Sequence, residues 1–152
     1  MVSNFKPADE NFELRVRESF DRQEVMKTVN ASILNVQAGE VELEFPFQAN
    51  LTQQHGFIHA GIVSTVLDSA CGYAAFSLMP KDAAVLTIEF KINLLSPAKG
   101  ACFRAVGSVK KPGRNITVTE GELFAWLDGK EKLVATMVGT IMSVYNREDV
   151  NQ

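Results

Sequence analysis

Hydrophobic positions in residues 59–78 recur at the spacing of an α-helix and give the clearest pattern in the chain. A run this apolar predicts a long helix that is buried on most of its surface. Bulky residues form one stripe along it, which suits packing against a sheet. The second stripe is small and mildly polar, with Gly61, Ser64, Thr65, Asp68, Cys71, Gly72 and Ala75. This small stripe leaves room for another copy of the helix or for a ligand.

Alternating apolar and polar residues predict strands on both sides of this helix. The predicted strands cover residues 33–36, 41–47, 84–95, 101–110, 115–127 and 132–144. Glycine-containing turns at Ala38-Gly39 and Asp128-Gly129 predict hairpins. In residues 84–95 the apolar side chains share one predicted face of the strand, and Thr87 lies on the other face. Gly107 is a candidate β-bulge.

The order of these elements indicates the fold class. Residues 9–30 have a helical pattern, and a polar tail that we expect to fray starts at about residue 145. Two strands, the long helix and four strands lie between them, which favours an α+β fold with an antiparallel sheet wrapped around the central helix. We expect one domain over residues 1–152. Because part of the small stripe would stay uncovered in a monomer, we also expect a homo-oligomer.

Composition excludes several classes of function. A net charge of −3 without a long basic cluster argues against a nucleic-acid surface. Cys71 and Cys102 both lie in apolar segments, so we expect reduced thiols in a cytoplasmic protein. Residues 1–6 do not resemble a secretory leader. We expect no membrane span, because polar residues inside 59–78 make insertion costly, and the sequence shows no cluster of metal ligands.

Asp68 is the only formally charged residue between Glu44 and Lys81. A carboxylate in such apolar surroundings carries a desolvation cost, so its presence indicates either a function or a structural role, in which Asp68 caps a neighbouring element or pairs with a lysine or arginine. The sequence leaves both interpretations open.

Three motifs together resemble the PaaI-type acyl-CoA thioesterases of the hotdog fold. They are His59-Ala60-Gly61 at the start of the central helix, Asp68 within it, and Ser96-Pro97-Ala98 after a strand. The turn at residues 112–114 is also similar to a turn of that family. Ala60 replaces the usual first glycine, and Gln53 stands where many members have asparagine, which indicates a His-Ala-Gly subgroup.

The resemblance implies a role for each of four residues. Asp68 would be the nucleophile or the general base, and Thr87 would steady the attacking water. The Ala60 backbone N–H, together with Gln53, would polarise the thioester carbonyl. In such enzymes these groups come from two subunits of a dimer or of a dimer of dimers. Alternation in 84–95 does not decide which face of the strand meets Asp68.

The same resemblance implies acyl-CoA as substrate, with no separate cofactor because coenzyme A is part of the substrate. Lys110, Lys111 and Arg114 surround one turn and are candidates for its phosphates, although a solvated hairpin tip explains them equally well. His59 either contacts the ligand or caps the helix, and Gly61 is a further candidate for substrate binding.

The sequence therefore predicts an acyl-CoA thioesterase. The alternative is a non-catalytic acyl-CoA-binding hotdog protein, which would be expected to lack the helix aspartate. A hotdog hydratase is disfavoured, because no Asp/His pair follows the central helix.

Overall fold

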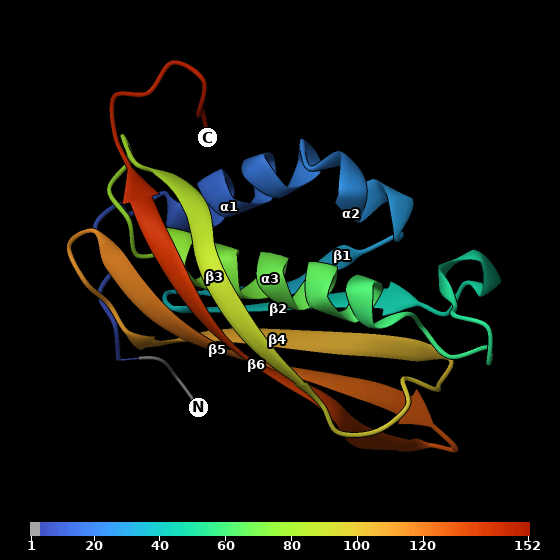
Figure 1. The fold of residues 1–152 in the computed structure, drawn as a ribbon. Coiled ribbons are helices and arrows are strands. Elements are labelled where there is room, and N and C mark those ends of the chain that lie inside the picture. The colour runs from blue at the N-terminus through green and yellow to red at the C-terminus, as the bar shows by residue number, and fades with distance from the viewer. Residues whose placement is uncertain (1–3) are drawn as a thin grey trace.

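An antiparallel sheet curves around one long helix in the computed structural model, which describes residues 4–152 (Figure 1). The helices are α1 (Phe12–Asp21), α2 (Glu24–Thr28), the 3-10 turn η1 (Ala49–Leu51) and α3 (Ala60–Phe76). The strands are β1 (Ser32–Gln37), β2 (Glu40–Pro46), β3 (Ala84–Leu94), β4 (Cys102–Lys111), β5 (Ile116–Leu127) and β6 (Lys130–Val144). Their order in the sheet is β1-β2-β4-β5-β6-β3. The predicted α+β fold with a central helix is confirmed.

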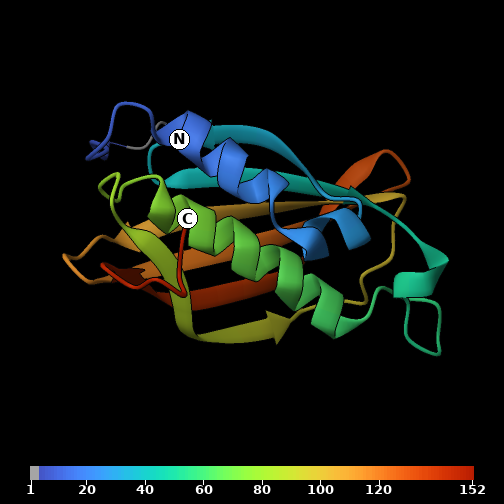
Figure 2. The ribbon, with the colours of Figure 1, turned by 90° about the horizontal axis from the view of Figure 1, so that it is seen from above.

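Helix α3 lies across the concave face of the sheet, and α1 and α2 lie next to α3 on that same face (Figures 1 and 2). Contact with β4 is very close: a Cβ on Gly107 would lie 2.3 Å from the carbonyl carbon of Ala70. Gly107 pairs in regular register with Val41 and Gly121, so the predicted bulge at this residue is wrong. The glycine is needed because the helix backbone occupies the space of a side chain.

The small stripe of α3 is only partly uncovered. Ser64, Thr65 and Asp68 are half-buried, whereas Cys71 is fully buried and faces the sheet. A Cβ on Gly121 of β5 would lie 2.9 Å from the Cys71 Sγ. Cys71 therefore belongs to the packing surface and not to the free face that the stripe predicted.

Strand β3 lies at one edge of the sheet and contains a β-bulge between Thr87 and Glu89. The extra residue shifts the alternation of side chains by one position. Consequently Thr87 faces α3, and so does Ile92, which packs against the core. The prediction that the apolar residues of 84–95 share one face opposite Thr87 is wrong for this reason.

Two further expectations concern the ends of the chain. The helix expected over residues 9–30 is broken into α1 and α2, because Gln23 has extended backbone angles and its side chain accepts a hydrogen bond from Ser69. The polar tail after β6 forms no helix or strand. It turns back so that Gln152 contacts α1 and β3 (Figures 1 and 2).

Residues 1–3 lie outside the described part, so the expectation about a leader at residues 1–6 falls partly on them. Within residues 4–152, no helix combines the length and apolar character that a membrane crossing requires.

Candidate active site

The start of α3 is shaped by the cap that His59 supplies. Its Nδ1 accepts a hydrogen bond of 2.8 Å from the backbone N–H of Gly61. This contact requires a lone pair on Nδ1, so the proton of the neutral ring lies on Nε2. Of the two roles left open for His59, capping is observed, and the Gly61 N–H is engaged by it. Among the described residues, the Ala60 N–H donates to no protein group.

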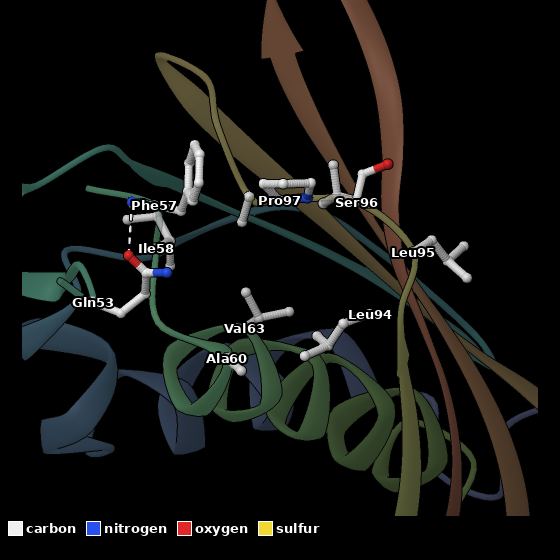
Figure 3. A pocket seen from close by; sticks show the side chains of 11 residues that line it. Gln53, Phe57, Ile58, Ala60, Val63, Leu94, Leu95, Ser96 and Pro97 are labelled. Atoms are coloured by element: carbon white, nitrogen blue, oxygen red, sulfur yellow. Dashed lines mark hydrogen bonds between the residues drawn. The ribbon is translucent and has the colours of Figure 1, made fainter. Parts of the chain in front are cut away.

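A cavity of about 410 Å³ lies beside this helix start (Figure 3). Gln53, Phe57, Ala60, Val63 and Leu94 line it, together with the Ser96-Pro97-Ala98 motif. The Gln53 Oε1 accepts hydrogen bonds from the backbone N–H groups of His55 and Phe57. Its amide nitrogen is therefore turned toward the cavity (Figure 3). Gln53 and Ala60 thus offer hydrogen-bond donors on the same cavity, as a developing oxyanion requires.

Asp68 lies in a second cavity, of about 250 Å³, between α3 and β3. The Thr87 hydroxyl donates a hydrogen bond of 2.8 Å to the Asp68 Oδ1. No lysine, arginine or histidine forms an ion pair with Asp68 in residues 4–152. Within one chain, Asp68 is therefore not part of a buried ion pair.

Burial raises the pKa of Asp68 above its ordinary value, and the hydrogen bond from Thr87 acts in the opposite direction. Desolvation destabilises the charged form, while a donor to the carboxylate stabilises it. A carboxylate in this environment is a stronger base than one in water, and it has a hydroxyl beside it to orient a water molecule.

The two cavities have no lining residue in common. Ala60 and Asp68 are eight positions apart on one helix, which corresponds to about 12 Å along its axis. Groups that act on one carbonyl must each lie within about 3 Å of it. Within one chain, Asp68 and the donors at Ala60 therefore cannot act on the same thioester.

Comparisons with known proteins bear on what these cavities do. The sequence model of the thioesterase superfamily matches residues 55–129. A thioesterase family protein from Silicibacter pomeroyi is 55% identical, and the match covers 89% of this chain and 99% of that one with a TM-score of 0.88. A Saccharolobus solfataricus protein is 30% identical over 118 residues, 77% of this chain and 81% of its own.

The chain belongs to the thioesterase superfamily. It is a hydrolase with the hotdog fold. The PaaI protein from the phenylacetic acid degradation operon of E. coli has the same fold, with 18% identity and a TM-score of 0.80 over 90% of this chain and 96% of that one.

The residues of this thioesterase that were predicted to bind the phosphates of coenzyme A do not line either cavity. Lys110, Lys111 and Arg114 are exposed at the turn between β4 and β5. Lys110 lies 3.6 Å from a carboxylate oxygen of Glu120 on the adjacent strand. This turn is at the end of the sheet opposite to the start of α3 (Figure 1). The fold therefore does not bring the three basic residues to Gln53 and Ala60 of the same chain.

Sequence reasoning missed several residues of the Asp68 cavity. Gln23, Tyr73 and Gln152 line it, and they come from three segments far apart in the chain. Tyr73 lies five positions after Asp68, outside the i+3 and i+4 spacing that places two residues on one helix face, so its position carried no signal for this cavity. Cys71 is close in sequence to Asp68, but burial raises the pKa of its thiol to about 12, so the thioesterase has no reactive thiolate there.

Proposed function

We propose that this thioesterase hydrolyses acyl-CoA to a free carboxylic acid and coenzyme A, with Asp68 as nucleophile or general base. The observation that carries the proposal is the hydrogen bond between Thr87 and Asp68, in a cavity where Asp68 has no cationic partner among the described residues. An unpaired, half-buried carboxylate with an adjacent hydroxyl has the features of a catalytic group.

In the general-base route, Asp68 removes a proton from a water molecule that Thr87 holds. The water oxygen bonds to the thioester carbon, and the carbonyl oxygen becomes an oxyanion. The Ala60 N–H, at the positive end of the α3 dipole, and the Gln53 amide stabilise that charge. The carbon–sulfur bond then breaks. A thiol with a pKa of about 8.5 leaves as thiolate without a strong general acid.

In the nucleophile route, the Asp68 carboxylate attacks the thioester carbon itself and displaces the thiolate. Water then hydrolyses the resulting anhydride and regenerates the carboxylate. Both routes use the same groups. Neither needs a cofactor, since coenzyme A enters as part of the substrate.

A dimer supplies the geometry that one chain lacks. About 12 Å separates Ala60 from Asp68 along α3, so a second subunit must bring its own helix start to Asp68. Strand β3 favours such an assembly, because it is an edge strand with exposed apolar side chains at Leu86, Ile88 and Phe90. An apolar unpaired edge is a ready surface for association. We propose that β3 of two chains meet at this interface.

A cytoplasmic location fits the two cysteines, which are both free thiols. Free thiols persist in reducing compartments. The proposed substrate and products are small molecules, and no nucleic acid or membrane takes part.

The test of the proposed function is thiol release from acyl-CoA by the parent protein and by Asp68→Asn. The substitution keeps the volume of the side chain and removes its charge, so kcat should fall by about 10²–10⁴-fold while acyl-CoA still binds. Asp82→Asn is the matched control, because Asp82 is exposed in the loop after α3. It should retain parent activity.

Two results would contradict the proposal. Asp68→Asn turnover equal to that of the parent would remove Asp68 from the site. Binding of acyl-CoA by the parent without any thiol release would favour a non-catalytic acyl-CoA-binding protein.

A further inference from the structure

The cavity at Asp68 extends along α3 away from the reacting groups. Gly72 and Tyr73 lie one helical turn beyond Asp68, and Val85 lies two residues before Thr87 on β3. All of them line the cavity, so it reaches from the carboxylate toward the C-terminal half of α3. One turn corresponds to about 6 Å of depth beyond the carboxylate.

Gly72 is the residue that keeps this space open. It is buried, yet a Cβ added to it would meet no atom within 4 Å. Glycine destabilises the interior of a helix relative to alanine, and packing gives no reason for it here. Gly107 and Gly121 differ, because a Cβ on either would lie within 3 Å of α3 atoms. The absent side chain at Gly72 therefore serves the volume of the cavity.

Gln152 also lines the same cavity. Its Oε1 accepts a hydrogen bond of 3.2 Å from the backbone N–H of Val85, and its Nε2 donates one of 2.6 Å to the Ser19 hydroxyl. That hydroxyl is 3.1 Å from the hydroxyl of Tyr73, and Ser19 and Tyr73 are both buried. The segment after β6 is thereby tied to β3 and α1 and, through Ser19, to α3. This segment lies beside α3 in the view from above (Figure 2).

We propose that Gly72 and Gln152 determine acyl-chain specificity. The cavity beyond Asp68 receives the acyl group, Gly72 gives it width, and Gln152 limits its length, so that the thioesterase prefers short acyl groups. This inference rests on the proposed function, because it assigns the acyl end of the same substrate.

The experiment measures kcat/KM for a series of straight-chain thioesters from acetyl-CoA to dodecanoyl-CoA. The parent should show a maximum at short chains. Gly72→Ala adds a methyl group to the cavity wall, so kcat/KM for the longest chain that the parent accepts should fall about tenfold or more while acetyl-CoA is unaffected. The melting temperature should rise, because alanine favours the helix. Gln152→Ala should extend the accepted range to longer chains.

Asn151→Ala is the control for Gln152. Its side chain donates to the Glu148 carbonyl and does not line the Asp68 cavity, so its chain-length profile should match the parent. Parent-like profiles in both Gly72→Ala and Gln152→Ala would overturn the specificity assignment and leave the proposed function intact. A parent that hydrolyses no member of the series but releases thiol from another acyl-CoA would overturn the specificity assignment alone, and a parent that releases thiol from no acyl-CoA would overturn both. A shift in Gln152→Ala that Asn151→Ala reproduces would show that the tail acts through its fold and not through Gln152.

Discussion

The hydroxyl of Thr87 donates to the carboxylate of Asp68 at 2.8 Å, across the gap between an edge strand and the central helix. The donor stabilises the ionised carboxylate and opposes the effect of burial on its pKa. The contact therefore extends to lower pH the range in which Asp68 can act as a base.

The first prediction concerns the acid limb of the pH–rate profile. Thr87→Val keeps the shape of the side chain and removes the hydroxyl, so the pKa of Asp68 should rise further. Since Asp68 works in its ionised form, activity should be lost at a higher pH than in the parent. Thr87→Ser restores the hydroxyl, so the acid limb should return to its position in the parent. The measurement is kcat/KM against pH for the three proteins, and an unmoved limb in Thr87→Val would refute the role of this hydrogen bond.

The second prediction concerns stability. The folded-state pKa of Asp68 is raised above that of the unfolded chain, so the folded state binds its proton more readily. The ionised carboxylate thus costs stability above the folded pKa, and this cost disappears below the unfolded value. Asp68→Asn should raise the melting temperature at neutral pH and lose that gain in acid. Thermal unfolding over a pH series tests this. A lower melting temperature at neutral pH would instead indicate a stabilising carboxylate.

Thr87 also illustrates where sequence reasoning reaches its limit. The central helix and Asp68 were predictable, because helical spacing and an isolated charge are local signals. The face of β3 on which Thr87 lies was not predictable, because the bulge after Thr87 depends on pairing with β6, which is more than fifty residues away along the chain. Strict alternation placed Thr87 away from the apolar side chains, and one extra residue reverses that.

Glycines and the polar tail show a second limit. Gly107 and Gly72 look alike in sequence, but one is pressed against the backbone of α3 and the other borders open space. Only the packing of separate elements distinguishes them. Residues 145–152 have no periodicity, so the contacts of Gln152 with Ser19 and Val85 carried no signal.

The third prediction tests β3 as the dimer interface. Ile88 is the bulge residue of this edge strand and is 51% exposed, and Leu34 is the bulge residue of β1 at the other edge and is 44% exposed. Ile88→Lys should place a charge in the interface, dissociate the dimer and abolish activity. Leu34→Lys should do neither. Size-exclusion chromatography with light scattering gives the masses, and an Ile88→Lys protein with the mass of the parent dimer would mean that β3 is not the contact.

The fourth prediction concerns the basic turn. Arg114 is exposed, so its substitution should leave the fold intact. Arg114→Ala should raise KM for acyl-CoA, and the effect should shrink as salt screens the phosphates. A short thioester that lacks the nucleotide should be hydrolysed as by the parent. If both substrates lose activity equally, Arg114 has a structural role.

The fifth prediction follows from the separation of the two half-sites along α3. Asp68→Asn and Gln53→Ala should each be nearly inactive alone. When the two variants are mixed under conditions that exchange subunits, half of the dimers are mixed, and each of these carries one site with an intact Asp68 and an intact partner Gln53. By this symmetry, activity should return to about a quarter of the parent value. Mixing Asp68→Asn with Asp68→Asn,Gln53→Ala is the control and should restore nothing. A mixture that stays inactive after confirmed exchange would mean that each chain assembles its site alone. Ala60 and Asp68 could then not act on the same thioester, because they are eight positions apart, which spans about 12 Å along α3.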